Sequence, residues 1–244
     1  VVRIAIQQSQ PTEELFNAIR HDYGEEVLGI VLALCKISDI KLKVSKEQAS
    51  DFRDMIVSYS EDPRVILIKL ADRLEVMRSL DIFPEAKRRT KSWESLNLYA
   101  QIAHKLGLYA IKSELEDLSL KYLEPEAYNH IVHELKESEK ERMAFIEEFL
   151  KPIRELLDRD GLKYHIKSRT KSVYSIFQKM RKQKVSFKGV YDIFALRIII
   201  DCPVEREKAL CWTVYSHVAS LYTPNPERMR DWISIPKSNG YEAL

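Results

Sequence analysis

A basic stripe with helical spacing is the first feature of this sequence that could do chemistry. In the segment KSRTKSVYSIFQKMRK, Lys171, Ser175 and Lys179 recur every fourth position, and Lys182 follows three positions later. This spacing places the four side chains on one face of a helix, opposite apolar residues. Arg169 stands at the expected strand-to-helix junction, where free N–H groups and the helix dipole attract phosphate. The stripe suits a triphosphate, and a solvated basic face is the alternative.

A carboxylate stands at the start of a long apolar segment further along the chain. Asp192 precedes IFALRIII, which has the composition of a central strand. Burying an unpaired carboxylate is unfavourable, and Mg²⁺ ligation would explain its presence, since Mg²⁺ binds carboxylates together with substrate phosphates. A turn before the strand is the alternative. Arg197 lies five residues later, so a regular strand places it on the other face unless a bulge intervenes.

The last residues combine cations with an aromatic ring around an expected turn. Lys237, Asn239 and Tyr241 follow the segment DWISI, and Arg228 and Arg230 lie just upstream. Tyr241 offers a π face to a base, and Asn239 offers both a hydrogen-bond donor and an acceptor. This group could hold a second phosphorylated ligand, and an ordinary hairpin turn is the alternative.

The composition predicts a folded protein with one basic region. Of the 244 residues, 31% are charged and 45% are hydrophobic, which excludes a disordered chain, and the net charge of +2 argues against a general polyanion binder. Between Lys163 and Lys188 there is no Asp or Glu. Cys35, Cys202 and Cys211 lack metal-binding spacing and indicate reduced thiols in the cytoplasm. Neither a membrane span nor a signal peptide is expected.

The elements that position these residues fall into two parts. Periodicity and start signals predict helices over residues 25–37, 45–60, 63–80, 93–106, 109–123 and 125–160, the last as two helices or as one broken near Pro152. The pattern then becomes strand, helix, strand, helix and strand, over residues 162–169, 171–183, 190–201, 204–222 and 231–235. This order predicts a small α/β domain that begins near residue 158.

Taken in order, these segments resemble the RelA/SpoT family, the long (p)ppGpp synthetase/hydrolases of the bacterial stringent response. SRTKSVYSIFQKM, VYDIFALRIII and RMRDWISIPKSNGYEAL are similar to the synthetase motifs. YGEEV, DPRVILIKLADRLEVMRSL and YAQIAHKLGLYAIKSELEDLSLKYLEP are similar to the helical hydrolase domain and its exit. The resemblance covers nearly the whole chain and implies pyrophosphoryl transfer from ATP to the 3′-hydroxyl of GTP or GDP.

The resemblance also implies roles for single residues. The residues expected to bind the ATP phosphates are Arg169, Lys171, Ser175, Lys179, Lys182 and Arg197. Asp192 would hold Mg²⁺ and, with Arg230 and Lys237, take part in catalysis. The residues expected to bind the guanine nucleotide are Arg230, Lys237, Asn239 and Tyr241, with Tyr241 stacked on the base. The family's further histidine and glutamate would lie beyond Leu244.

The helical part of this family carries a second metal centre, of the HD type, which holds Mn²⁺. The resemblance places its later aspartate at Asp72, on a helix face shared with apolar residues. Glu75 and Val76 replace the usual His and Asn, and VVRIAIQQSQPTEEL lacks both the His-Asp and the Glu-Asp pair. These departures predict a degenerate hydrolase domain. His21 and Asp22 lie past the family position and are interpreted as an exposed helix end.

The combined expectation is a mainly α fold. An all-helical HD-type domain would span residues 1–124, connecting helices 125–157, and a small α/β nucleotidyltransferase-like synthetase domain with a mixed sheet 158–244. The expected function is a cytoplasmic, Mg²⁺-dependent (p)ppGpp synthetase, with Mn²⁺ only if the HD site is functional. A bifunctional enzyme with an active hydrolase and a nucleotide-sensing module are the alternatives. The chain is expected to be a fragment, with any ribosome or tRNA contacts made by regions outside it.

Overall fold

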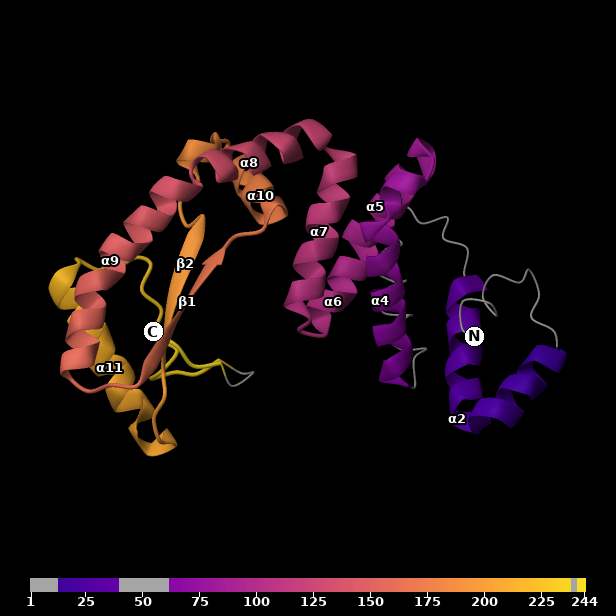
Figure 1. Ribbon diagram of the computed structural model, residues 1–244, viewed down its shortest axis with the longest axis horizontal. Coiled ribbons are helices and arrows are strands. Elements are labelled where there is room, and N and C mark those ends of the chain that lie inside the picture. Colours follow the sequence, from indigo (N-terminus) through magenta and orange to yellow (C-terminus); the bar gives the residue numbers. More distant parts are fainter. Residues whose placement is uncertain (1–12, 40–61, 238–240) are drawn as a thin grey trace. The chain divides into compact units, whose positions relative to one another are not determined.

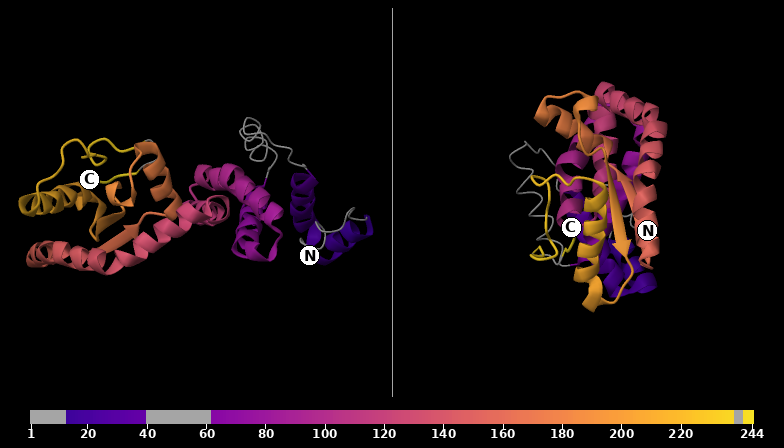
Figure 2. Two further views of the ribbon diagram at one scale, coloured as in Figure 1. Left: turned by 90° about the horizontal axis from the view of Figure 1, so that it is seen from above. Right: turned by 90° about the vertical axis from the view of Figure 1, so that its left-hand side faces the viewer.

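The computed structural model describes residues 13–39, 62–237 and 241–244. The chain divides into two compact units. The first comprises Val1–His130 and Ser172–Gln178, and the second comprises Ile131–Lys171 and Lys179–Leu244. Figure 2 gives two further views of the ribbon. The helix expected over residues 45–60 lies outside the described residues.

The first unit is built from helices (Figure 1). They are α2 (Glu13–Asp39), α4 (Pro63–Arg78), α5 (Glu85–Glu94), α6 (Ala100–Lys105) and α7 (Tyr109–Leu123). A π-helical stretch, Ser95–Tyr99, connects α5 with α6. Within α2 the backbone kinks at Gly24, where φ is +85°. Positive φ is a conformation that glycine adopts without a steric penalty.

Local chemistry fixes the start of α4 where the sequence predicts it. Pro63 occupies the first turn, and the Asp62 side chain caps the helix by accepting a hydrogen bond from the Arg64 N–H at 2.9 Å. Proline suits this position because its missing N–H would have no helical partner. The apolar face of α4 is buried with residues of α6 and α7, including Leu70, Ile102 and Leu115. This cluster forms the main core of the first unit.

The charged helical stretch after α7 consists of two helices. They are α8 (Pro125–Glu137) and α9 (Glu139–Arg159), which confirms the alternative of two helices. They meet at Ser138, and the other alternative, one helix broken near Pro152, is not formed, because Pro152 lies inside α9. The Ser138 hydroxyl donates to the Glu134 carbonyl, and Arg142 donates to the Leu135 carbonyl. These bonds satisfy carbonyl groups that the end of α8 leaves unpaired.

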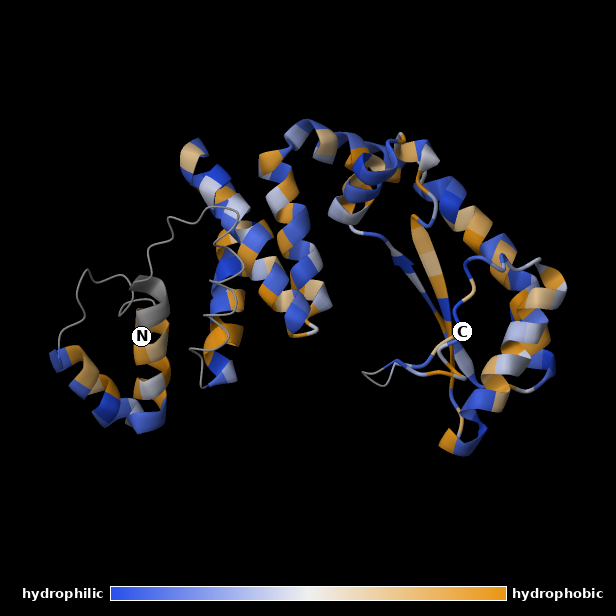
Figure 3. Ribbon diagram, turned by 180° about the vertical axis from the view of Figure 1, so that it is seen from behind, coloured by the Kyte–Doolittle hydropathy of each residue, from blue (hydrophilic) through white to orange (hydrophobic). Residues whose placement is uncertain are grey.

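The second unit contains an antiparallel pair of strands, β1 (Tyr164–Thr170) and β2 (Phe194–Ile200). One sheet face packs with α9 and with α11 (Val204–Leu221), burying Ile146, Ile153 and Leu157. Figure 1 shows α9 and α11 side by side along the strands. In Figure 3, β2 is mostly hydrophobic and β1 mostly hydrophilic. The remaining helix, α10 (Val173–Gln183), follows β1, and its first residues belong to the first unit.

The mainly α architecture is confirmed, but one expected strand is not formed. Residues 231–235 form a turn, in which the Asp231 carboxylate accepts hydrogen bonds from the Ile233 and Ser234 N–H groups at 3.0 and 2.8 Å. Aspartate competes for nearby amides in this way and so favours turns over strands. The sheet of the described residues is therefore two-stranded and antiparallel, and the expected mixed sheet is not formed in it. Among the helices described, none combines the length and hydropathy needed to cross a membrane.

Candidate active site

Three cations surround one carboxylate just before β2. The Asp192 carboxylate lies 2.7 Å from the Lys179 Nζ, 3.2 Å from the Lys171 Nζ and 3.4 Å from the Arg228 Nη1. Its side chain is 48% exposed, so the group is open to solvent. We call these four residues the Asp192 cluster.

Each member of the Asp192 cluster is held by a different element. Lys171 extends β1 by one residue, because its N–H donates to the Ile193 carbonyl at 2.8 Å. Lys179 projects from α10, and Arg228 lies in the segment after α11, with its guanidinium 5.7 Å from the Tyr191 ring centroid. Segments far apart in the sequence therefore meet at one carboxylate.

The backbone of Asp192 is left-handed, with φ of +62°. Few non-glycine residues adopt this conformation, although aspartate does so more readily than most, and it is often found at functional sites. Because Asp192 is not part of the regular strand, side-chain alternation along β2 does not extend back to it. The regular alternation that would place Asp192 and Arg197 on opposite faces of one strand therefore does not apply to this pair.

The cations keep Asp192 ionised. The hydrogen bond from Lys179, followed by that from Lys171, lowers the pKa of Asp192 from 3.8 to about 2. Burial lowers the pKa of Lys171, and the hydrogen bond to Asp192 raises the pKa of Lys179. With three cations around one anion, the cluster carries excess positive charge and can accept phosphate groups.

Two further predicted cations lie on the exposed face of the sheet. Arg169 is opposite Ala195, and Arg197 is opposite Lys167 in the β1–β2 register. Both arginines are exposed, and neither forms an ion pair within the described residues. Their side chains are thus available to an anionic ligand.

The predicted basic stripe on α10 is only partly brought together. Lys179 joins the Asp192 cluster, whereas Lys182 is exposed and is not a member of it. Ser175 is engaged locally, since its hydroxyl accepts a hydrogen bond from the Ser172 hydroxyl at 2.8 Å.

The start of α10 does not offer the free N–H groups that were expected to bind phosphate. The Asp117 carboxylate of α7 accepts hydrogen bonds from the Tyr174 N–H at 2.8 Å and from the Val173 N–H at 3.2 Å. Burial raises the pKa of Asp117, while these two amide hydrogen bonds act in the opposite direction. The first amides of α10 are therefore capped by a side chain of the same protein, Asp117, and not by a ligand.

The C-terminal residues form a cation–aromatic group. The Lys237 Nζ lies 4.7 Å from the Trp232 ring centroid and 5.3 Å from that of Tyr241. The Lys237 N–H donates to the Tyr241 carbonyl at 3.2 Å. Arg230 donates to the carbonyls of Glu227 and Met229. Asn239 lies outside the described residues.

Sequence reasoning missed two members of these groups. Arg228 was noted only as an upstream cation, because 36 residues separate it from Asp192. Trp232 was assigned to a strand, although its ring faces Lys237. The available signal for Trp232 was its aromatic ring, in the same C-terminal segment as Tyr241, the tyrosine predicted to stack on a base.

The predicted remnant of an HD centre lies at the surface. Asp72 is exposed on α4, and the His21 and Asp22 side chains, bonded to each other at 2.9 Å, are exposed as expected. No group of three or more potential metal ligands occurs in the part of the chain that the structure describes. Residues 1–12 and 40–61 lie outside that part.

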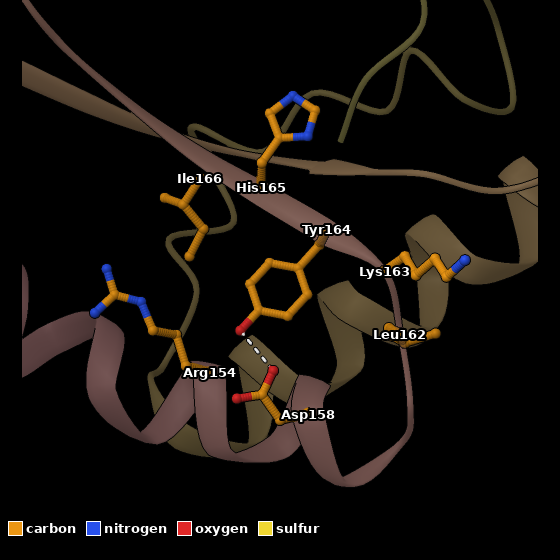
Figure 4. A pocket seen from close by; sticks show the side chains of 7 residues that line it. All are labelled: Arg154, Asp158, Leu162, Lys163, Tyr164, His165 and Ile166. Carbon is orange, nitrogen blue, oxygen red and sulfur yellow. Dashed lines mark hydrogen bonds between the residues drawn. The ribbon is translucent and has the colours of Figure 1, made fainter.

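An open pocket of about 500 Å³ lies between α9 and β1 (Figure 4). In it the Tyr164 hydroxyl donates to Asp158 at 2.9 Å, and Arg154 is paired with Glu147 at 2.7 Å. None of the predicted site residues lines this pocket. Figure 4 shows Tyr164 and Ile166 on the α9 side of the strand and His165 on the other side.

Comparisons with known proteins define the class first. A family model described as "HD domain" matches residues 3–109, and one described as "Region found in RelA / SpoT proteins" matches residues 168–244. The HD match falls in the helical part of the chain, and the RelA/SpoT match falls in the part that contains β1 and β2. The chain belongs to the RelA/SpoT family.

Relatives of this chain carry different activity names. A guanosine-3′,5′-bis(diphosphate) 3′-pyrophosphohydrolase of Aquifex aeolicus is 39% identical, covering 96% of this chain and 33% of the relative. A GTP pyrophosphokinase of Myxococcus xanthus is 37% identical, covering 98% of this chain and 31% of the relative. The bifunctional (p)ppGpp synthase/hydrolase SpoT of Escherichia coli is 36% identical, with 96% and 33% covered. The chain thus spans about a third of the length of the curated relatives it matches.

Proposed function

We propose that this chain carries the synthetase centre of a cytoplasmic (p)ppGpp-metabolising enzyme. In the reaction, the 3′-hydroxyl of GTP or GDP loses its proton and its oxygen attacks the β-phosphorus of ATP. The bond between the β-phosphorus and the oxygen that bridges it to the α-phosphorus breaks, and AMP leaves with that oxygen. The observation that carries this proposal is the Asp192 cluster, an ionised carboxylate among three cations. Phosphoryl transfer depends mainly on positioning and on neutralising charge, which such a cluster can do.

The cations of the second unit would share the ATP phosphates. Lys171 and Lys179 form ion pairs with Asp192 and can exchange this partner for phosphate oxygens when ATP and its metal arrive. Arg169 and Arg197 are exposed and are not paired within the described residues. Guanidinium groups bind phosphate with two parallel hydrogen bonds, which adds orientation to charge. Ser175 and Lys182 would contribute from α10.

Asp192 would hold Mg²⁺, and its chemistry fits this ion. Mg²⁺ prefers carboxylate oxygens together with substrate phosphates, and Asp192 supplies an ionised, half-exposed carboxylate beside phosphate-binding cations. When bound, the metal would neutralise charge that develops on the phosphate oxygens.

The C-terminal residues would bind the guanine nucleotide. Tyr241 is partly exposed and can stack on the base, while Lys237 and Arg230 can contact phosphates. The Lys237 ammonium lies over one face of the Tyr241 ring, so a base that stacks on that face would displace it. Asn239 would add a hydrogen-bond donor and acceptor for the base.

The helical unit is proposed to be a degenerate hydrolase domain with a structural or regulatory role. Val76 cannot form the hydrogen bonds of the asparagine usual there, and Glu75 stands in place of a histidine. Hydrolysis is named for several relatives, so a bifunctional enzyme is the second candidate.

A label-transfer assay tests the synthetase proposal. The full-length protein is incubated with Mg²⁺, GDP and ATP labelled on the β-phosphate, and guanosine products are separated. We expect labelled ppGpp, which Asp192→Asn abolishes because the metal-binding carboxylate is removed. Asp201→Asn removes an exposed carboxylate at the other end of β2 and should leave transfer intact. An absence of label with folded wild-type protein would contradict the proposal.

A further inference from the structure

The two faces of the β1–β2 pair differ in chemistry. On one face, Tyr164, Ile166 and Leu196 pack with α9 and α11. The other face carries the alternate residues, as Figure 4 shows for His165, which points away from α9. Since successive side chains of a strand alternate, Lys167 shares the face of His165.

The residues of this second face are mostly basic. In the strand register they pair as His165 with Ile199, Lys167 with Arg197, and Arg169 with Ala195. No Asp or Glu belongs to either strand. Lys171, the next residue of this alternation, extends the ladder by a backbone hydrogen bond and is itself a member of the Asp192 cluster.

The pairing of Lys167 with Arg197 places like charges directly opposite each other. Backbone hydrogen bonds join residues 171 and 193 at one end of the ladder and residues 163 and 201 at the other. By the alternation of antiparallel pairs, Lys167 and Arg197 are then a hydrogen-bonded pair, with Cα atoms about 5.5 Å apart. Both side chains are exposed, and neither has an ion-pair partner among the described residues.

Like charges directly opposite each other destabilise a sheet, so the Lys167–Arg197 pair lowers the stability of the ligand-free protein. At the far end of the same ladder the chain places Lys163 beside Asp201, where the charges are opposite. The row Lys171, Arg169, Lys167 advances about 6.8 Å per step, which brings successive cations within reach of neighbouring groups of one extended polyphosphate.

We propose that Lys167 is a further ATP-binding residue, which together with Arg197 holds a phosphate group of the bound nucleotide. The inference rests on the proposed function in taking ATP as the ligand of this face. Lys167 would thus bind the same ligand as the basic stripe. The helical spacing that defines the stripe could not identify it, because Lys167 belongs to β1. Arg197 supplies a planar fork and Lys167 a mobile point charge, so that the two can bind different oxygens of one phosphate.

The test measures binding separately from transfer. The full-length protein is titrated with Mg²⁺ and α,β-methylene-ATP, which cannot transfer its pyrophosphoryl group, and separately with GDP. For Lys167→Thr we expect the Kd for the ATP analogue to rise about tenfold, as for loss of a charged hydrogen bond. The Kd for GDP should stay within about twofold, as for a distant surface change. Lys167→Arg should restore binding of the analogue.

Two controls keep a structural role apart from a binding role. Lys163→Thr removes the same charge from a residue beside Asp201 and should change the Kd for the analogue by less than about twofold. Lys167→Thr should leave the melting temperature of the ligand-free protein unchanged or raised, because it removes like-charge repulsion. A lowered melting temperature with a correspondingly weak affinity for both nucleotides would assign Lys167 a structural role and overturn the inference.

The outcomes also separate this inference from the synthetase proposal. Unchanged binding of the analogue by Lys167→Thr, with label transfer intact in the wild type, would overturn the inference alone. Binding that depends on Lys167, without any label transfer, would contradict the synthetase proposal alone. Equal losses for the analogue and for GDP would show a general electrostatic effect and would also overturn the role of Lys167.

Discussion

Asp192 is ionised near neutral pH. Its pKa is about 2 because Lys179 and Lys171 donate hydrogen bonds to it. In the ligand-free protein the carboxylate is therefore paired with Lys171 and Lys179, the cations proposed to bind phosphate. Binding of a metal to Asp192 would release the two lysines for phosphate, so that metal and nucleotide should bind cooperatively.

Tyr241 tests the residue-level assignment of the guanine site. Replacing Tyr241 by Ala removes the ring available for stacking, and we expect guanine nucleotide binding to weaken by about tenfold, since base stacking on an aromatic side chain is worth roughly 1–3 kcal/mol. Tyr241→Phe keeps the ring and should bind nearly as the wild type. Titration calorimetry with GDP and with α,β-methylene-ATP measures both ligands, and equal losses for the two would contradict a stacking role.

Helix α10 depends on a cap supplied by another helix. Asp117 of α7 accepts hydrogen bonds from the first amides of α10, at Val173 and Tyr174. The same element carries Lys179 of the Asp192 cluster. The first residues of α10 are therefore held by α7 within the first unit.

Removing this cap should loosen the start of α10. Asp117→Ala leaves two amides without their acceptor and should lower the free energy of unfolding by about 1 kcal/mol, as for other lost helix caps. Asp117→Asn keeps an acceptor oxygen and should lose less. Amide hydrogen exchange at Val173 and Tyr174 measures the effect locally. Unchanged protection of these amides in Asp117→Ala would contradict the capping role.

Asp117 should also make stability depend on pH in a defined direction. Burial raises its pKa in the folded protein above the ordinary value of 3.8, so folding favours the protonated form. The stability that Asp117 contributes relative to Asp117→Asn is then greatest below pH 3.8 and declines as pH rises through the folded pKa. Urea unfolding of both proteins from pH 3 upwards measures this difference in the free energy of unfolding. A difference that grows with pH would contradict the assignment.

The sequence predicted those elements whose limits depend on local chemistry. The start of α4 at Pro63 follows from residue types within a few positions. The strand β2 was predicted from its composition, but it begins at Phe194 and not at residue 190. Two helices were one of the alternatives predicted for residues 125–160, but the place of the break was not. Helix α9 continues through Pro152, where packing of buried residues such as Ile153 stabilises it. The Arg228–Asp192 contact was missed for another reason, since only the folded chain brings such distant residues together.

At the scale of the whole molecule, the two units carry different chemistry. The second unit holds the Asp192 cluster and the basic sheet face. The first is helical, and its predicted metal residue Asp72 is exposed. Within the described residues, the Asp192 cluster and the basic sheet face occur in the second unit, and neither unit contains a group of three or more potential metal ligands.

A metal and hydrolysis assay tests the proposed loss of the second activity. Protein purified without chelators should contain little Mn²⁺, and it should not release pyrophosphate from ppGpp when Mn²⁺ is added. The bifunctional Escherichia coli relative, assayed alongside, provides the positive control. Stoichiometric Mn²⁺ together with pyrophosphate release would show that the helical unit is an active hydrolase.

The left-handed backbone at Asp192 restricts how this position can change between related chains. With φ of +62°, it suits Gly, Asn and Asp better than other residue types. Of these three, Asp is the one that carries a negative charge. Under the proposed metal role of Asp192, a lineage without need of that metal would drift to Asn or Gly without disturbing the loop. The residue type at this position should then distinguish chains that keep the activity from chains that have lost it.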